Sequence, residues 1–323
     1  MPVFKTKTNA GYTVNISGSL AFDRIMFFPG VFSEHILPGQ VHNLNISFFL
    51  ESLRQSDGGT AGNIAYNLAL LGERPTILGV AGFDFLAYRD KLQVIGVDVS
   101  RVRIIKKLRT ATAHIITDQK DNQIAAFFPG PLPTDYVKKT ASFKKAEPAI
   151  ISPDDKGRMM EYANIYQKKG VPYIFDPGQA VIAFSGPELL KIIRRAKLLI
   201  GNDYEIKLIS NKIGISFTEL CREAGITVVT KGAEGSEIQA NGKKILIKAV
   251  RINKVIDPTG AGDAYRAGFI KGLLLGHSLE ACGRMGSVAA AFAVERQGTQ
   301  NHKFTGLSFK KRYFAEYKDR LSI

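Results

Sequence analysis

The stretch "VPYIFDPGQAVIAFSGPELLKIIRRAKLLIGN", residues 171–202, contains one complete strand–helix–strand unit. The short apolar runs "PYIFD" and "KLLIGN" predict buried strands, and "GPELLKIIRRA" between them places its apolar residues at helical spacing. Successive strands joined through a helix run parallel, because the helix carries the chain back to the starting edge of the sheet. This unit therefore predicts part of a parallel sheet covered by helices.

The same alternation continues on both sides of that unit. Upstream, strands are expected at 12–18, 75–82 and 148–152, with helices at 61–72, 85–96 and 154–170; downstream, a helix is expected at 217–225 and a strand at 226–232. Repeated units of this kind predict an α/β fold with a mostly parallel sheet and helices on both faces. Ligands of such sheets bind beyond the carboxyl ends of the strands.

Two segments, 25–56 and 102–130, depart from this alternation. "HNLNISFF" (42–49) and "TATAHIITDQKDNQIAAFF" (110–128) alternate polar and apolar residues with a period of two, and the second has a hairpin turn around 118–122. We predict that both segments form a small antiparallel β lid, and that 1–24, 57–101 and 131–323 form a large α/β domain. Each segment carries "FFPG" (27–30 and 127–130), either as a shared lid feature or as a coincidence of two strand ends.

Composition excludes several classes of function. The chain has 323 residues and a net charge of +15, but its basic residues form scattered doublets without interleaved aromatic residues, so no nucleic-acid partner is expected. A polyanionic small substrate explains the charge equally well. No apolar run approaches the ~20 residues of a membrane span, and no export signal is seen. Two cysteines outside any C-x-x-C pair favour a reducing, cytoplasmic location.

The segment "DPTGAGDAYRAGF", residues 257–269, carries the strongest chemical signal. Gly260 and Gly262 allow a sharp turn, and the amides of Ala261, Gly262 and Asp263 then begin a helix that can stabilise negative charge. A carboxylate in that anion hole can act as a general base toward a hydroxyl that attacks a phosphoryl group. The alternative is an ordinary capped helix, for which Asp263 would only satisfy free amides.

Taken together, four motifs resemble the ribokinase-like (PfkB) family of sugar and nucleoside kinases over nearly the whole chain. They are "DPTGAGDAYRAGF", "DGGTAGNIAYNLALLG" (57–72), "GNDYEI" (201–206) and "VVTKGAEG" (228–235). The resemblance implies a three-layer α/β/α fold with a small β lid, ATP as phosphoryl donor, Mg²⁺, and a monovalent cation such as K⁺. It also implies Asp263 as general base, with Gly260, Ala261 and Gly262 forming the anion hole.

The N-terminal third is most similar to the bacterial adenosine kinase branch, through "SGSLAFDRIMFFPGVFSEHILPG" (17–39), "QIAAFFPG" (123–130) and "ERQGTQNH" (295–302). This similarity implies transfer of the ATP γ-phosphate to the 5′-hydroxyl of adenosine, giving AMP and ADP. The alternatives are a kinase of another nucleoside, or of a sugar such as ribose or a fructose phosphate. A regulatory protein that kept the fold is disfavoured by the intact motifs.

The resemblance also assigns binding residues. The nucleoside would contact Ser19, Asp23, Gly59, Asn63, Phe127 and Gln179, with Asp23 on the ribose hydroxyls and Phe127 stacked on the base. The donor side would comprise Asn202, Glu205, Thr230, Lys231, Gly232, Gly235 and Asn301, with Glu205 holding Mg²⁺ through water. Ala113 departs from the branch, which carries an aromatic residue there, and this weakens the expected adenine preference. Arg266 either steadies phosphate charge or is a solvated helix residue. A homodimer through the lid is expected, because its strand edges are open.

Overall fold

The computed structural model describes residues 14–36, 46–120, 122–132, 137 and 147–321. At its centre lies an eight-stranded sheet with the order β14-β13-β12-β11-β10-β9-β1-β4. The strands are β1 (Asn15–Ser17), β4 (Thr76–Leu78), β9 (Ala149–Ile151), β10 (Tyr173–Phe175), β11 (Leu198–Asn202), β12 (Ile226–Thr230), β13 (Ser236–Ala240) and β14 (Lys243–Ile247). The strands from β4 to β12 pair in parallel, and the hairpin β13–β14 adds two antiparallel strands at one edge.

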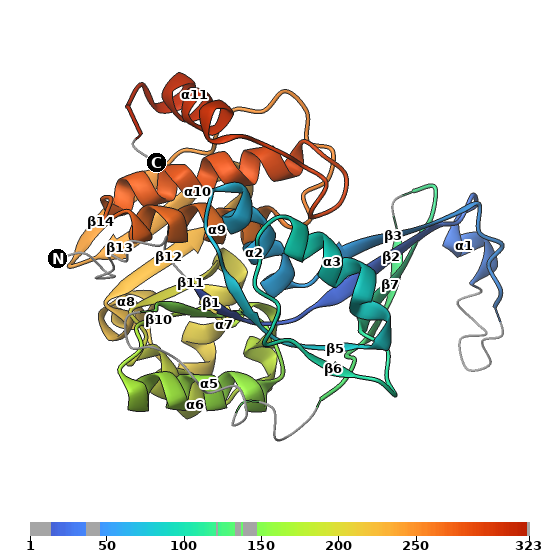
Figure 1. Ribbon diagram of the computed structural model, residues 1–323, viewed down its shortest axis with the longest axis horizontal. Coiled ribbons are helices and arrows are strands. Elements are labelled where there is room, and N and C mark those ends of the chain that lie inside the picture. The colour runs from blue at the N-terminus through green and yellow to red at the C-terminus, as the bar shows by residue number, and fades with distance from the viewer. Residues whose placement is uncertain (1–13, 37–45, 121, 133–136, 138–146, 322–323) are drawn as a thin grey trace.

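Helices cover both faces of this sheet (Figure 1). One face packs against α2 (Thr60–Leu70) and α9 (Ala261–Leu274), and the other against α5 (Lys156–Lys169), α6 (Gly186–Ile193), α7 (Asp203–Ile213) and α8 (Phe217–Ala224). Helix α10 (Leu279–Val294) packs beside α9 and against β13 and β14, and α11 (Gly306–Tyr317) packs against α10, which completes a third apolar cluster. The three-layer α/β/α arrangement is therefore the one that the sequence predicts.

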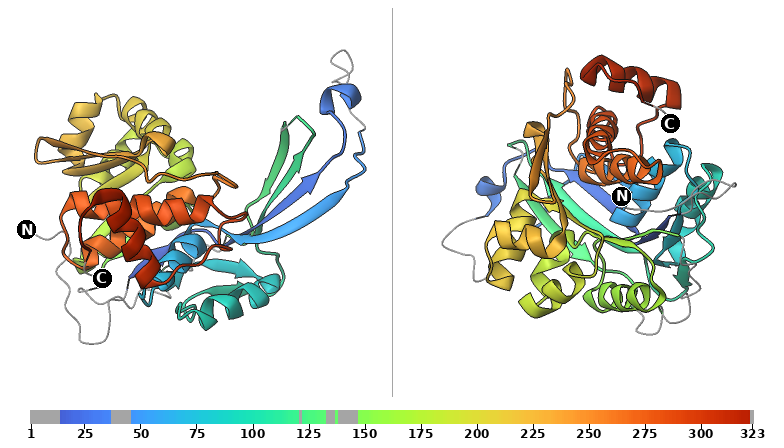
Figure 2. Two further views of the ribbon diagram at one scale, coloured as in Figure 1. Left: turned by 90° about the horizontal axis from the view of Figure 1, so that it is seen from above. Right: turned by 90° about the vertical axis from the view of Figure 1, so that its left-hand side faces the viewer.

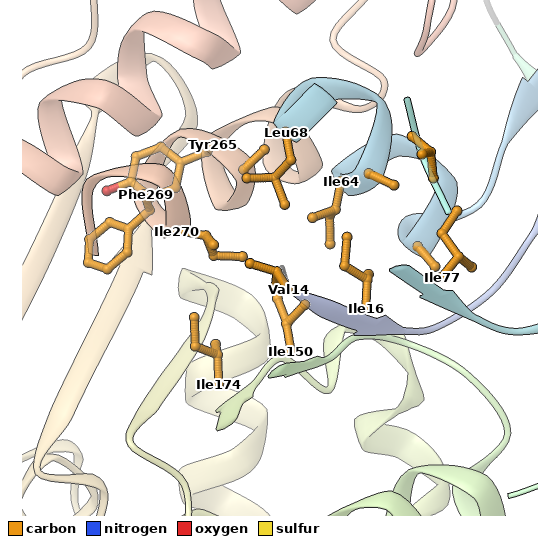
Figure 3. Close-up of a cluster of buried hydrophobic side chains, with 14 of the residues drawn as sticks. Val14, Ile16, Ile64, Leu68, Ile77, Ile150, Ile174, Tyr265, Phe269 and Ile270 are labelled. Carbon is orange, nitrogen blue, oxygen red and sulfur yellow. The ribbon is translucent and has the colours of Figure 1, made fainter. Parts of the chain in front are cut away.

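Strand residues alternate between these two layers because successive side chains point to opposite faces. In β9, Ile150 belongs to the cluster under α2 and α9, whereas Ala149 and Ile151 belong to the cluster under α5. Figure 3 shows the first cluster, in which Ile64 of α2 and Ile270 of α9 point toward the strand side chains. Both faces are apolar, so the strands read as continuous apolar runs in the sequence.

A second, four-stranded sheet with the order β3-β2-β7-β8 projects from one side of the body (Figure 2). Its strands are β2 (Ala21–Phe27), β3 (Ser52–Gly58), β7 (Ala111–Thr117) and β8 (Gln123–Phe128), and the short helix α1 (Phe32–His35) follows β2. The outer pairs are antiparallel as expected, and the hairpin between β7 and β8 turns at Asp118–Asn122, but β2 and β7 pair in parallel. We call this sheet the lid; the division into two domains remains a prediction.

Three local predictions need correction. "HNLNISFF" is not the lid strand: residues 42–45 lie outside the described residues, residues 46–49 have no strand structure, and the strand begins at Ser52. The segment 75–82 forms two strands, because the chain leaves the central sheet at Gly79 and continues as β5 (Val80–Gly82) beside β6 (Arg103–Ile105). The expected helix at 85–96 starts as a 3-10 turn, Phe83–Phe85, followed by α3 (Leu86–Val94).

Short 3-10 turns also follow two strands of the central sheet. They are Gly178–Ala183 after β10 and Gly232–Glu234 after β12. Both lie at the carboxyl ends of parallel strands, where ligands of such sheets bind. No helix of the described residues is long and apolar enough to cross a membrane.

Candidate active site

A polar cavity of about 370 Å³ opens where β10, β11 and β12 end and α9 begins. Many of the predicted site residues line it, from segments that are distant in the sequence: Gln179, Asn202, Glu205, Thr230, Gly232, Gly260, Gly262 and Asp263. Asp176, Thr60 and Arg266 complete the polar part of the wall. The carboxyl ends of adjacent parallel strands meet at this edge, so the topology brings these motifs together.

The turn at the start of α9 has the conformation that its glycines permit. Gly260 precedes the helix with a φ of 78°, a left-handed conformation that disfavours other residues. A side chain at Gly260 would also lie 3.0 Å from the Thr299 side chain. The first-turn amides of Gly262 and Asp263 have no intrahelical acceptor, since the first such bond runs from Ala264 to the Gly260 carbonyl. The turn thus presents donors and a carboxylate to the same cavity.

Asp263 lies on this cavity with one protein hydrogen bond to its side chain among the described residues. The amide nitrogen of Asn63, on α2, donates to one carboxylate oxygen of Asp263 at 2.8 Å. Desolvation by burial raises the pKa of Asp263 to about 7, with further elevation from Asp176 and Asp23, and Arg266 and Asn63 act in the opposite direction. A carboxylate with a pKa near neutrality is suited to accept a proton during catalysis.

Arg266 lies one turn into α9 and is buried, so the prediction of a solvated helix residue is wrong. Its guanidinium binds both carboxylate oxygens of Asp176, with one of the two distances at 2.6 Å, and donates to the Gly262 carbonyl at 3.0 Å. Asp176 is also buried, and that burial raises its pKa while Arg266 lowers it. The pair joins the end of β10 to the first turn of α9 and fixes the turn against the sheet.

Asn202 and Glu205 form a reciprocal capping box at the start of α7. The Glu205 amide donates to the Asn202 side chain at 2.7 Å, and the Asn202 amide donates to the Glu205 carboxylate at 2.8 Å. Burial raises the pKa of Glu205, with a second contribution from Asp176. No cluster of three or more metal-ligating side chains occurs among the described residues. Direct chelation of a metal by the protein therefore has no support in these residues, whereas a single carboxylate behind water is compatible with Mg²⁺.

A second cavity of about 570 Å³ adjoins the polar one and shares Thr230, Gly232 and Gly262 with it. Its remaining wall is mostly apolar. Together with Gly235, Tyr265 and others, this wall comprises Ala233, Ala249, Val250, Ile252, Val255, Ala261, Ala290, Ala291 and Val294. An apolar cavity of this size that borders a polar cavity suits a flat heteroaromatic group carrying a charged tail. The sequence reasoning identified Gly235 but not the wall formed by α10 and residues 249–255.

Two predicted donor-side residues lie elsewhere. Lys231 binds Glu237 at 2.8 Å and lines neither cavity, because the Glu237 carboxylate on β13 holds its ammonium group. Asn301 is exposed, donates to the Gln297 carbonyl at 2.8 Å and also lines neither cavity.

On the lid, Asp23 pairs with Ala113, and Ala113 pairs with Phe127. Directly paired residues point to the same face, so Asp23 and Phe127 share one face of the lid with Ala113 between them. Burial raises the pKa of Asp23, and the charge of Asp257 in the body raises it further. This face of the lid is therefore turned toward the start of α9. Phe127 is 63% exposed, so its ring is free to contact a ligand.

Ser19 and Gly59 lie where β2 and β3 meet the N-terminus of α2. The Ser19 hydroxyl accepts from the Thr60 amide at 3.1 Å, and Thr60 itself lines the polar cavity. Gly59 has a φ of 84°, and a side chain there would lie 2.6 Å from the Ala21 amide nitrogen. Gly59 thus lets α2 begin against the base of the lid, and neither residue lines the two cavities.

The sequence reasoning did not assign Asp176 a role. A signal was present, since "YIFD" ends in a carboxylate at the carboxyl end of a predicted strand, where ligands collect. Its pairing with Arg266 could not be read from spacing, because 90 residues separate the two.

Comparisons with known proteins show what the chain is similar to. The family model of pfkB carbohydrate kinases matches residues 46–305. The chain is 33% identical over 260 residues to a nucleoside kinase of Methanocaldococcus jannaschii, covering 80% of this chain and 85% of that protein. It is 35% identical over 280 residues to a nucleoside kinase of Methanothermobacter thermautotrophicus, covering 83% and 88%.

The solved structure of a Burkholderia thailandensis nucleoside kinase in complex with inosine superposes with a TM-score of 0.84 at 34% identity, covering 95% of this chain and all of that one. The same kinase has also been solved in complex with ADP-inosine. These similarities confirm the ribokinase-like fold. With the family model covering most of its length, the chain belongs to the pfkB family of carbohydrate kinases and is a phosphotransferase that acts on an alcohol group.

Proposed function

We propose that this protein is a nucleoside kinase that transfers the γ-phosphate of ATP to the 5′-hydroxyl of a nucleoside, with adenosine as the first candidate and AMP, a purine salvage product, as the result. The observation that carries the proposal is the position of Asp263, a carboxylate of raised pKa on the polar cavity, beside a turn that also borders the apolar cavity. Phosphoryl transfer needs this arrangement of acceptor, base and donor.

In the proposed reaction, Asp263 accepts the proton of the 5′-hydroxyl group while the oxygen of that hydroxyl group attacks the γ-phosphorus of ATP. The first-turn amides of α9 stabilise charge on the transferring group. Arg266 keeps the turn in place through Asp176, and Asn63 holds one oxygen of Asp263. Closure of the lid over the acceptor excludes water that would otherwise hydrolyse ATP.

On the donor side, the apolar cavity suits the adenine ring of ATP, and the shared wall of Thr230, Gly232 and Gly262 suits its phosphates. Mg²⁺ would neutralise phosphate charge, and Glu205 would hold it through water. A monovalent cation such as K⁺ remains part of the proposal, supported only by the family resemblance.

On the acceptor side, Asp23 can accept hydrogen bonds from the two ribose hydroxyls, and Phe127 on the same face can stack on the base. Ala113, between them, offers no second aromatic surface. A kinase of another nucleoside is therefore the second candidate, and the inosine complex of the Burkholderia relative favours the same broad acceptor class. Ribose and fructose phosphate are weaker candidates, because neither would use Phe127.

The deciding experiment measures ADP release with adenosine, inosine, guanosine, ribose and fructose 6-phosphate at equal concentrations. We expect turnover with nucleosides and at least about 100-fold lower kcat/KM with free ribose, which lacks the stacked base. Identification of the product as a 5′-monophosphate completes the test. Preference for ribose or fructose 6-phosphate would overturn the nucleoside assignment while leaving the kinase assignment intact.

We also propose a homodimer through the lid. β8 is exposed along its length, and Ile124 and Phe128 on this strand present apolar surface, as does Leu53 on β3 at the other edge of the lid, although Phe127 is reserved for the ligand. Light scattering of the wild type and of Ile124→Lys tests it; a monomeric wild type contradicts it. A cytoplasmic location remains our expectation, consistent with ATP as donor and with the free thiols of Cys221 and Cys282.

A further inference from the structure

A chain of hydrogen bonds leads away from Asp263 to the base of the lid. Asn63 donates to Asp263 at 2.8 Å, and the side-chain oxygen of Asn63 accepts from the amide nitrogen of Gln300 at 2.9 Å. The same Gln300 nitrogen also donates to the hydroxyl oxygen of Tyr88. Tyr88 in turn donates to the Gly58 carbonyl, the last residue of lid strand β3, at 3.1 Å.

The chemistry of these groups fixes the direction of every bond. An ionised carboxylate only accepts, so Asn63 must turn its NH₂ group toward Asp263 and its oxygen away from it. Gln300 supplies the donor that this oxygen needs. If the Asn63 amide were reversed, its oxygen would face the carboxylate and its NH₂ group would face the NH₂ group of Gln300. Gln300 therefore selects the one orientation in which Asn63 donates to Asp263.

Tyr88 holds Gln300 in place. It is 1% exposed, and burial raises its pKa, so the hydroxyl stays protonated and donates to the Gly58 carbonyl. Its oxygen is then left to accept the second hydrogen of Gln300. A side chain at Gly62 would lie 1.9 Å from the Tyr88 hydroxyl, so only glycine at this position of α2 leaves room for this hydrogen-bond network of Asp263, Asn63, Gln300, Tyr88 and Gly58.

We propose that Gln300 is a positioning residue for the phosphoryl transfer: through Asn63 it fixes one oxygen of Asp263 and leaves the other oxygen to face the acceptor hydroxyl. The catalytic consequence of this proposal rests on the proposed function. The orientation of Asn63 toward Asp263 can be tested separately in the free enzyme. Gln300 reaches no reacting atom itself; it acts only through Asn63.

The network has a measurable signature at Asp263. The hydrogen bond from Asn63 lowers the pKa of Asp263, against the upward effect of burial. The charged groups that act on Asp263 are Arg266, Asp176 and Asp23, and none of them belongs to the network. Loss of the Gln300 donor frees Asn63 to turn, and the pKa of Asp263 should then rise while its charged surroundings stay unchanged.

The experiment compares wild type, Gln300→Leu, Tyr88→Phe and, as matched control on the same loop, Gln297→Leu, whose side chain binds Arg54 of the lid. Titration of the Asp263 carboxyl by ¹³C NMR, assigned through its absence in Asp263→Asn, gives its pKa without any turnover. For Gln300→Leu we expect an upward shift of about one pH unit, the size typical for loss of one hydrogen bond to a charged group. Tyr88→Phe should give a smaller shift, and Gln297→Leu none.

Kinetics supply the second readout. Gln300→Leu should lower kcat at pH 7 about tenfold and recover part of that loss at pH 9, with the nucleoside KM little changed, because positioning of the base affects mainly the chemical step. If Gln300→Leu fails to fold, Gln300→Met keeps the side-chain length without a donor for Asn63 and without a new charge, and the same upward shift is expected. A Gln300 variant that matches Gln297→Leu in both titration and kcat overturns the proposal.

The outcomes separate this proposal from the proposed function. A pKa shift in Gln300→Leu without nucleoside turnover in the wild type would support the network and refute the nucleoside kinase. Full turnover in the wild type together with an unshifted Gln300→Leu would refute the network alone.

Discussion

Two carboxylates of the polar cavity, Asp176 and Asp263, have opposite surroundings. Asp176 is 1% exposed and binds the buried guanidinium of Arg266 through both oxygens. Among the described residues, Asp263 has only the neutral amide of Asn63 as a hydrogen-bond partner; it faces the cavity, and Arg266 acts on it as a nearby charge without a direct hydrogen bond. A buried carboxylate that is bound by a cation contributes to structure, whereas a desolvated carboxylate that faces a cavity without a bound cation is available for proton transfer. The comparison separates a carboxylate that maintains the turn from one that is free to take part in the proposed proton transfer.

The largest effect should come from Asp263→Asn, which removes the base and keeps the size of the side chain. We expect kcat to fall by about 10²–10⁴-fold, the usual contribution of a general base. Nucleoside binding, measured by calorimetry, should stay near the wild-type value. A variant with wild-type kcat would refute the assignment of the base.

Asp176→Asn should act mainly on stability. It leaves the buried Arg266 without its carboxylate and should cost about 3–5 kcal/mol in the free energy of unfolding, measured by urea denaturation. The double variant Asp176→Leu with Arg266→Met serves as control, because it removes both charges and should recover part of that loss. A single variant as stable as the wild type would remove the distinction between the two carboxylates.

The wild-type enzyme should show the raised pKa of Asp263 in its pH profile. The pKa of about 7 means that the carboxylate is largely protonated below pH 7 and ionised above it. We expect kcat/KM for the nucleoside to fall about tenfold per pH unit below 7 and to level off above. A profile that stays flat down to pH 5 would contradict the role of Asp263 as base.

The smallest effect concerns the stability of Asp263→Asn itself. Because the folded-state pKa of Asp263 is raised above its ordinary value of 3.8, ionising it costs stability progressively between about pH 4 and pH 7. The asparagine variant cannot ionise, so its melting temperature should exceed that of the wild type by a few degrees at pH 8 and match it more closely at pH 5. Scanning calorimetry at both pH values measures the difference; an equal offset at both would argue against the raised pKa.

Much of the fold follows from local sequence. Asp155 caps α5 through the Arg158 amide, and Gly170 ends that helix in the left-handed conformation. The apolar runs of β9, β10 and β11 were recognisable because each is buried on both faces. "HNLNISFF" gave a wrong prediction, because period-two alternation also occurs in chain without strand structure, as at residues 46–49, whereas the actual strand Ser52–Gly58 is mostly polar and largely exposed. An exposed lid strand lacks the apolar signal on which the prediction depends.

The residues of the candidate site likewise divide into those that local sequence predicts and those whose positions depend on the folded chain. Gly260, Gly262 and Asp263 could be predicted together because a turn and a helix start are local features. Lys231 and Asn301 could not be placed correctly, since Glu237 on β13 and the Gln297 carbonyl bind their side chains in the folded chain. The apolar cavity was not foreseen, because α10 and residues 249–255 form its wall only when α10 packs beside α9.

The sequence by itself determined the parallel α/β body, the turn before α9 and the carboxylate in it, because each depends on neighbouring residues and on short-range periodicity. Only the tertiary structure decided that Arg266 binds Asp176 and not Asp263, and that Asn63, itself bound by Gln300, donates to Asp263. The physical reason is that charge compensation and desolvation depend on groups up to 237 residues apart in the chain, and spacing along a sequence does not encode distances of that kind.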